Sequence, residues 1–126
     1  MLTNEITKKN LNKMVVRFYA KIINDDVVGP FFIEKLGDNL NNNLWKPHIE
    51  LLTNFWASIT IGDQNYRGNP LAPHLHLGGL ERSTFEQWLN LFFETLDTIY
   101  EPHIADFFKE RSTIIAGNFM RNLRIA

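Results

Sequence analysis

Apolar residues recur at three- and four-residue steps through four segments of this chain. Such spacing gathers side chains on one face of an α-helix. The first segment covers residues 11–23 and ends at the polar run 24–26. Its apolar positions are Leu11, Met14, Val15, Phe18, Tyr19, Ile22 and Ile23. We expect a helix here whose apolar face is buried in a core.

The second segment covers residues 44–59 and carries a histidine within its apolar stripe. The stripe consists of Leu44, His48, Leu51, Leu52, Phe55, Trp56 and Ile59. Pro47 is compatible with the start of a helix, because the N–H groups of the first turn have no intrahelical partners. His48 is therefore expected to face inward with the apolar side chains.

Two further helices are expected in the C-terminal third of the chain. Ser83, with Glu86 three residues later, matches a capping box that opens a helix over residues 83–100. Its inward face is Phe85, Trp88, Leu89, Phe92, Leu96 and Tyr100. Pro102 stands where a first helical residue would be, and apolar positions with helical spacing continue to Phe119. No strand-like alternation competes with these helices.

The connections between the helices are irregular in sequence. A turn is expected at residues 29–30, and the polar run 37–43 is expected to be a loop. The stretch 62–73 contains two glycines and two prolines, which is too broken for a long helix. His74 and His76 follow that stretch directly, so both are expected at the end of an irregular connection.

Four helices of this kind predict one all-α domain over residues 1–126, in which two antiparallel pairs bury the four apolar stripes. The chain is 44% hydrophobic and 21% charged, which is ordinary for a globular protein and argues against disorder. The formal net charge is -1 without a basic stripe, so neither nucleic acid nor anionic lipid is an expected partner. No apolar run could cross a bilayer and the N-terminus lacks a secretory signal, so a cytoplasmic protein is expected.

The chemistry that is absent narrows the choice of site. The chain has no cysteine, which excludes disulfides, thiolate ligands and haem attached through thioether bonds. Phosphate-cradling glycine loops, metalloprotease histidine pairs and nucleophile elbows are also missing. The Glu-x-x-His signature of di-iron bundles is missing too, because the residues three positions before the four histidines are Trp45, Leu71, Pro73 and Tyr100. A metal site built on a single histidine remains.

Each candidate side chain also has a purely structural interpretation. His48 is either a core histidine bonded to a backbone carbonyl or part of a ligand pocket. Tyr19 and Trp88 are either ordinary core residues whose polar tips reach local acceptors or pocket residues. If the three converge, they form an apolar pocket with a few hydrogen-bond donors, as a ligand bound to a metal requires.

The remaining histidines are judged in the same way. His74 is either a solvent-facing loop residue or an iron ligand. Because His74 and His76 are two residues apart, they point to different sides of the backbone, and one alone is the expected axial ligand. His103, beside Pro102 at a helix start, is expected to be a solvated surface residue.

The order and spacing of several short motifs resemble the third group of truncated globins, and this likeness covers most of the chain. The motifs are Phe18-Tyr19, Gly29-Pro30-Phe31-Phe32, Trp45-Lys46-Pro47-His48, Phe55-Trp56, Tyr66-Arg67-Gly68-Asn69-Pro70-Leu71-Ala72-Pro73-His74 and Phe85-Glu86-Gln87-Trp88-Leu89. In that family a two-over-two helical sandwich encloses haem b. The resemblance therefore implies a globin-like fold that holds haem b and binds dioxygen or another diatomic ligand.

The resemblance also implies roles for individual residues. His74 becomes the proximal iron ligand, in a short helix. It is preferred to His76 because the third-group pattern places the histidine four residues after the proline of Asn-Pro. Tyr19 becomes the principal distal hydrogen-bond donor, Trp88 the second donor and His48 the distal histidine.

The same likeness assigns further residues around the haem. Phe32 packs against the porphyrin, while Leu52 and Phe55 line the distal wall. The residues that bind the propionates are sought among Lys46, Tyr66 and Arg67.

The expected function is binding of a diatomic ligand at a haem iron. A tyrosine hydroxyl, an indole N–H and a protonated imidazole nitrogen each stabilise a ligand that carries partial negative charge. Two such donors slow ligand release, which suits chemistry better than oxygen transport. A peroxidase-like or nitric oxide dioxygenase-like activity, with a reductase as electron donor, is the enzymatic extension. A monomer is expected, and the alternative function is a cofactor-free helical module for protein interaction.

Overall fold

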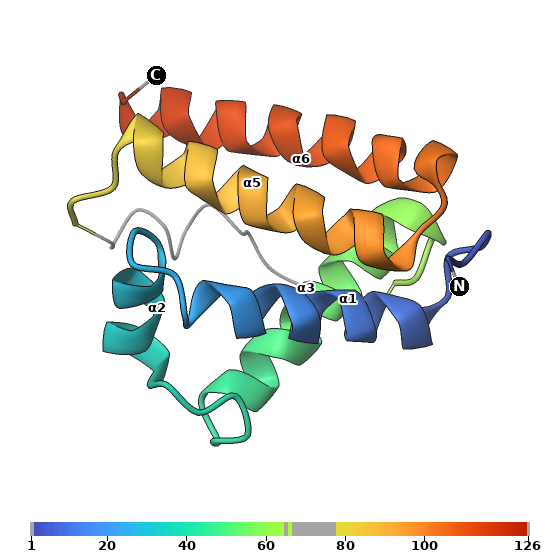
Figure 1. The fold of residues 1–126 in the computed structure, drawn as a ribbon, viewed down its shortest axis with the longest axis horizontal. Helices are drawn as coiled ribbons and strands as arrows, with labels where there is room; N and C mark the ends of the chain where they lie inside the picture. Colours follow the sequence, from blue (N-terminus) through green and yellow to red (C-terminus); the bar gives the residue numbers. More distant parts are fainter. Residues whose placement is uncertain (1, 65, 67–77, 126) are drawn as a thin grey trace.

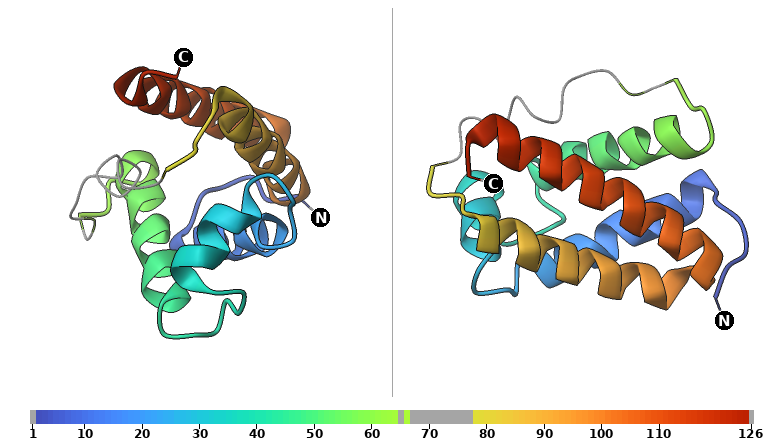
Figure 2. Two further views of the ribbon diagram at one scale, coloured as in Figure 1. Left: turned by 90° about the vertical axis from the view of Figure 1, so that its left-hand side faces the viewer. Right: turned by 90° about the horizontal axis from the view of Figure 1, so that it is seen from above.

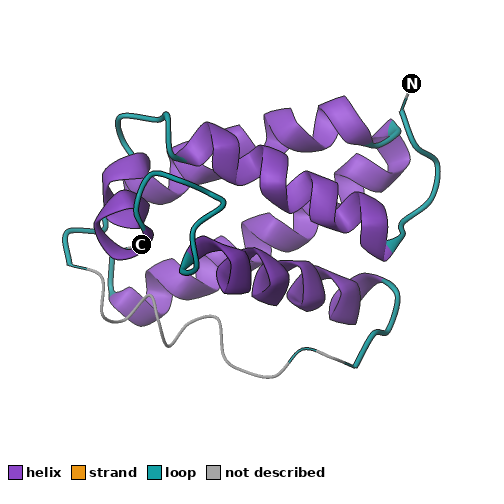
Figure 3. Ribbon diagram, turned by 90° about the horizontal axis from the view of Figure 1, so that it is seen from below, coloured by secondary structure: helices purple, strands orange, loops and turns teal. Residues whose placement is uncertain are grey.

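The computed structural model describes residues 2–64, 66 and 78–125 of the chain. The helices in this part are α1 (Lys8–Ile22), α2 (Gly29–Leu36), α3 (Trp45–Thr60), α5 (Arg82–Ile99) and α6 (Pro102–Leu123). Figure 3 draws helices and loops without a strand in the described part. One isolated parallel bridge joins Thr3 to Tyr100. The expectation of an all-α protein is therefore confirmed.

The helices form two antiparallel pairs. In one pair, α1 packs against α3, with Tyr19 beside His48 and Asn12 beside Thr53. In the other pair, α5 and α6 lie side by side and run in opposite directions (Figure 1). Close packing of α1 against α5 joins the two pairs (Figure 2), and the ring of Trp56 carries α3 into contact with α5 and α6. This arrangement agrees with the two pairs expected from the apolar stripes.

Aromatic side chains fill much of the core between the pairs. Trp56 of α3 stacks on Phe92 of α5, with ring centroids 5.4 Å apart. Tyr100 stacks in the same way on Phe108 of α6 at 5.1 Å. The Tyr100 hydroxyl donates to Asn10 Oδ1 at 2.7 Å, so the corner between α5 and α6 is held to the start of α1. The high aromatic content of the chain therefore stabilises the contacts between helices as well as the candidate site.

The start of α5 differs from the expected capping box. The helix begins at Arg82, so Ser83 lies inside its first turn. The hydroxyl of Thr84 accepts the backbone N–H of Glu81 at 3.2 Å. The predicted pair of Ser83 and Glu86 is therefore wrong. The N-cap residue is Glu81, two positions before Ser83, and Thr84 is the third residue of the helix. Thr84 is buried against the core, whereas Ser83 is exposed.

The segment that contains Gly29 and Pro30 is a helix and not the expected turn. Pro30 lies in the first turn of α2, where a missing N–H costs no hydrogen bond. A Cβ atom at Gly29 would lie 2.7 Å from the backbone oxygen of Ile22. The glycine therefore allows the start of α2 to rest directly on the end of α1. This helix carries Phe32 into the core.

The polar run 37–43 is a loop, as expected, and its side chains hold the start of α3. Asn42 Oδ1 accepts the N–H groups of Leu44 and Trp45 at 2.9 and 2.8 Å. Asn42 Nδ2 donates to the carbonyl oxygen of Leu36 at 2.8 Å, so one amide joins the end of α2 to the start of α3. The position of α3 relative to α2 is fixed by these bonds.

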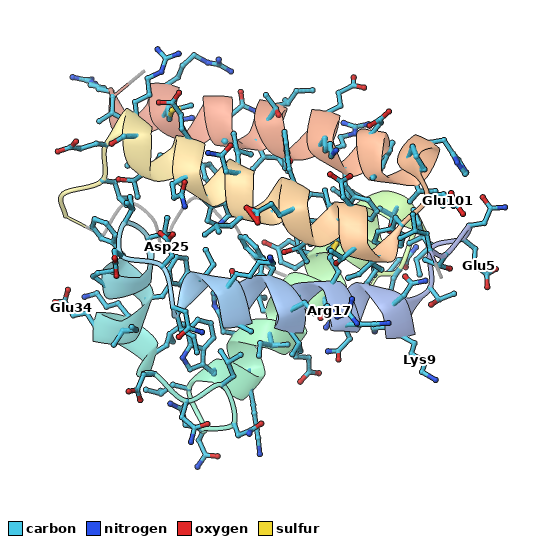
Figure 4. All side chains as sticks on the ribbon, in the orientation of Figure 1. Glu5, Lys9, Arg17, Asp25, Glu34 and Glu101 are labelled. Atoms are coloured by element: carbon cyan, nitrogen blue, oxygen red, sulfur yellow. The ribbon has the colours of Figure 1, made fainter. Side chains whose placement is uncertain are left out.

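The outer faces of the helices carry the charged side chains. Lys9 and Arg17 on α1 and Glu34 on α2, labelled in Figure 4, are all exposed. None of the helices in the described part of the chain is both long and apolar enough to cross a membrane.

Candidate ligand-binding site

Three helices bring aromatic rings around the phenol of Tyr19. Tyr19 lies on the inner face of α1, and its side chain is 3% exposed. Its ring centroid lies 5.5 Å from that of Phe32 on α2. The rings of Trp45 and His48, one turn apart on α3, lie at 5.0 and 5.1 Å. We refer to these four residues as the Tyr19 cluster. Tight packing from three elements holds the phenol in one place.

A hydrogen bond joins the two polar atoms at the centre of the Tyr19 cluster. The Tyr19 hydroxyl lies 3.1 Å from His48 Nε2. Either atom can donate, depending on which nitrogen of the imidazole carries a proton. When Nε2 carries it, the imidazole donates to the phenol oxygen and leaves the tyrosine proton free to point at a ligand. The predicted inward orientation of Tyr19 and His48 is confirmed, and the two meet.

Burial also fixes the protonation state of Tyr19. Loss of contact with water raises the pKa of this phenol well above its ordinary value. The hydroxyl is therefore a neutral hydrogen-bond donor throughout the physiological pH range.

Trp45 anchors the Tyr19 cluster to the rest of the fold. Its side chain is fully buried, and its indole N–H donates to the carbonyl oxygen of Gly37 at 2.7 Å. Its ring stacks on Phe32 at 6.1 Å and meets the His48 ring edge-on at 5.5 Å. Trp45 belongs to one of the motifs that resemble truncated globins, but the motif implies no role for it. The signal was its place three residues before His48, on the same side of a helix.

Trp88 approaches the Tyr19 cluster from α5. Its ring meets Phe18 edge-on at 5.1 Å and stacks on Phe92 at 5.4 Å. Phe18 in turn contacts the ring of Tyr19 at 5.1 Å. Trp88 is half-buried. The structure therefore brings a donor on α5 to within one aromatic ring of Tyr19.

The remaining predicted residues fall into two groups. Leu52 and Phe55 are partly buried on α3 and pack against the core. The ring of Tyr66 lies 5.3 Å from that of Phe55, and burial raises the pKa of its phenol. Lys46 is exposed in the first turn of α3. The second group, Arg67, His74, His76 and the short helix expected around His74, lies outside the described residues.

Two further observations concern candidate metal ligands. Within residues 2–64, 66 and 78–125, no three His, Asp or Glu side chains are grouped so that they could hold a metal ion. His103 is exposed near the start of α6, as expected. The described part of the site is therefore a set of hydrogen-bond donors and apolar rings.

Known proteins show where this architecture occurs. A scan against models of protein families finds no match. The group 3 truncated hemoglobin ctb of Campylobacter jejuni is 33% identical over 118 residues, which cover 94% of this chain and 91% of that protein. The crystal structure of a group III truncated hemoglobin from Campylobacter jejuni matches with a TM-score of 0.90 at 32% sequence identity. That match covers 98% of this chain and 95% of the other.

Proposed function

Because the chain belongs to the group 3 truncated haemoglobins, we propose that it holds one haem b through His74 and binds dioxygen or another diatomic ligand beside Tyr19, His48 and Trp88. Membership of this family implies a globin-type role in binding ligands at haem. It favours this role over a cofactor-free interaction module. The observation that carries the more specific proposal is the Tyr19–His48 hydrogen bond inside a ring of aromatic side chains.

The residues present fit the distal side of a haem. Tyr19, His48 and Trp88 offer a hydroxyl, an imidazole nitrogen and an indole N–H, which are the donor types that a partly negative diatomic ligand needs. When bound, haem supplies an iron with one open coordination position for a diatomic ligand.

Tyr19 is proposed as the main donor to the ligand. Its hydroxyl is buried and neutral, and the surrounding rings hold it in position before a ligand arrives. A preorganised donor loses little free energy to rearrangement on binding, and exclusion of water strengthens its electrostatic interaction. A hydrogen bond to a charged partner contributes about 1.5–3 kcal/mol. Tyr19 is therefore expected to slow ligand release.

His48 sets the direction of the tyrosine proton. With Nε2 protonated, His48 donates to the phenol oxygen, and the tyrosine proton is directed to the ligand. With Nε2 unprotonated, the phenol donates to His48 and is withdrawn from the ligand. The chain's own residues determine which of these two states of His48 is more populated.

Apolar residues are proposed to shape the haem cavity. Phe32 contacts Tyr19 and His48, at 5.5 and 6.3 Å between ring centroids, and would pack against the porphyrin. Leu52 and Phe55 would form the distal wall and keep water from the ligand. The propionates are assigned to a choice among Lys46, Tyr66 and Arg67.

Slow release of the ligand leads us to propose redox chemistry, with nitric oxide or peroxide, in preference to oxygen transport. Such chemistry consumes electrons, so a reductase would act as electron donor. We propose that the protein acts in the cytoplasm.

The assignment of the iron ligand is tested by haem retention in single variants. His74→Ala is expected to be purified without haem, because it removes the proposed bond to iron. His76→Ala and the exposed control His103→Ala are expected to retain haem. Haem content is measured from the absorption spectrum relative to protein concentration. Loss of haem in His76→Ala alone would transfer the role to His76, and full retention in both variants would overturn the proposal.

A further inference from the structure

One carboxylate, that of Asp25, joins three helices beside the site. Asp25 follows the end of α1, and its Oδ2 accepts the N–H groups of Val27 and Val28 at 3.0 and 2.9 Å, just before α2. Its Oδ1 accepts from Nε2 of Gln87, on α5, at 2.8 Å. Figure 4 labels Asp25 at the end of the molecule where α2 and α5 approach each other. The side chain therefore ties α1, α2 and α5 together.

The orientation of the Gln87 amide follows from its two neighbours. An ionised carboxylate only accepts hydrogen bonds, so the amide nitrogen must face Asp25. The amide oxygen of Gln87 accepts from Asn90 Nδ2 at 3.4 Å. Burial acts to raise the pKa of Asp25, but hydrogen bonds from Val28, Gln87 and Val27 outweigh it and lower the pKa. Asp25 is therefore ionised at neutral pH, and its bond to Gln87 is charge-assisted.

The bond connects the helices that carry the proposed donors. Gln87 directly precedes Trp88 on α5, whereas Asp25 lies just beyond the end of α1, the helix that carries Tyr19. The ring of Phe18, on α1, lies between the rings of Trp88 and Tyr19, at 5.1 Å from each. A change in the spacing of α1 and α5 would move the Trp88 indole relative to Tyr19.

We propose that Gln87, bonded to Asp25, is a positioning residue that holds the indole N–H of Trp88 at the distance from Tyr19 that the diatomic ligand requires. The inference rests on the proposed function, because it concerns the same pocket. Gln87 does not itself touch the ligand, and it acts through the position of α5.

A second link between α1 and α5 provides a matched control. Lys21 Nζ lies 3.6 Å from Glu94 Oε1, and the two side chains are 37% and 61% exposed. Exposed pairs of this kind are weakened by water and salt. The part-buried bond of Asp25 to Gln87 is therefore expected to control the spacing of the helices near Trp88, while the Lys21–Glu94 pair is not.

The test compares Gln87→Met with Glu94→Gln in haem-loaded protein. Methionine keeps the length and bulk of the side chain and removes the donor. Oxygen dissociation is measured by stopped flow, and the C–O stretching frequency of the carbon monoxide complex is measured by infrared spectroscopy. We expect Gln87→Met to speed oxygen dissociation about three- to tenfold and to shift the C–O frequency, because donor geometry controls such interactions at the sub-ångström level. Glu94→Gln is expected to change neither.

A double variant shows whether the effect passes through Trp88. In a Trp88→Phe background, Gln87→Met is expected to cause no further acceleration, because the donor it positions is gone. Gln87→Glu, as a second variant, replaces the donor by an acceptor facing Asp25 and is expected to accelerate dissociation at least as much as Gln87→Met. A separate readout is the titration of the Asp25 carboxyl by NMR, where Gln87→Met is expected to raise the pKa because one stabilising bond is lost.

The outcomes separate this inference from the proposed function. Unchanged oxygen dissociation in both Gln87 variants, alongside acceleration in Trp88→Phe, would overturn the positioning role and leave the donor role of Trp88 intact. A lower melting temperature without any change in rate or C–O frequency would show that the bond is only structural, and would also overturn the inference. Unchanged dissociation in Trp88→Phe would contradict the proposed donor itself, and the positioning role with it.

Discussion

At the scale of single residues, Tyr19 and Tyr100 are both buried phenols, but their hydroxyl groups have different partners. The Tyr100 hydroxyl donates to Asn10 Oδ1, and that same oxygen accepts the backbone N–H of Thr7 at the start of α1. The Tyr19 hydroxyl faces His48, whose ring can either donate or accept. Tyr100 therefore has a purely structural bond, whereas the bond of Tyr19 can rearrange when a ligand enters.

This contrast gives a matched pair of variants. Tyr19→Phe is expected to speed oxygen dissociation at least tenfold, because it deletes a buried donor to a partly charged ligand, a contribution of about 1.5–3 kcal/mol. Tyr100→Phe is expected to leave the dissociation rate unchanged and to lower the free energy of unfolding by about 1 kcal/mol. Stopped-flow mixing and urea unfolding measure the two effects. Equal dissociation rates in wild-type protein and Tyr19→Phe would remove Tyr19 from the distal side.

The same two phenols predict how stability depends on alkaline pH. Burial raises the pKa of Tyr19 and of Tyr100 well above the ordinary value. The folded state therefore keeps protons that the unfolded chain releases, so this contribution is complete below about pH 10 and is lost as pH rises further. We expect the free energy of unfolding to fall above about pH 10, less steeply in Tyr100→Phe than in wild-type protein. Urea unfolding across this range measures both slopes, and identical slopes would contradict the interpretation.

At the scale of helices, the contact of α2 with the end of α1 decides where Phe32 lies. The backbone of Gly29 approaches the Ile22 carbonyl oxygen so closely that a Cβ atom would lie 2.7 Å from it. Backbone atoms on both sides of this contact cannot move without shifting a helix. The position of Phe32 against Tyr19 and Trp45 therefore depends on a glycine outside the site.

Two glycine-to-alanine variants test this packing. Gly29→Ala is expected to lower the free energy of unfolding by about 1–3 kcal/mol, as overpacking does. Gly117→Ala, in α6, is the control, since its Cβ would meet only the end of the Arg121 side chain at 3.6 Å. That variant is expected to stabilise the protein by about 0.5–1 kcal/mol, because alanine favours a helix over glycine. Denaturant midpoints of the two variants give the comparison, and a neutral Gly29→Ala would contradict the close contact.

At the scale of the whole molecule, hydrophobic periodicity predicts the four long helices but not α2. Residues 29–36 include a glycine and a proline at their start, which is typical of a turn. Their helical structure depends on contacts with other segments, namely the Asp25 side chain at Val27 and Val28 and the backbone of α1. A single sequence does not display such contacts.

The candidate site also contains some contacts that the sequence predicts and others that it does not. The apolar stripes predict that Tyr19 and His48 face inward, and the helical pairing brings them together. The bond between Asp25 and Gln87 spans 62 residues and belongs to no periodic pattern, so the sequence does not predict it. The roles of His74, His76 and Arg67 stay predictions, since these residues lie outside the described part of the chain.

The absorption spectrum of the purified protein, recorded in ferric, ferrous and carbon monoxide forms, shows whether the chain holds a haem whose iron can bind a diatomic ligand. We expect a Soret band that shifts when carbon monoxide is added to the ferrous protein, because a haem iron bound by one histidine can still bind a diatomic ligand. A colourless, fully helical and stable protein that gains no Soret band on incubation with haem would contradict it.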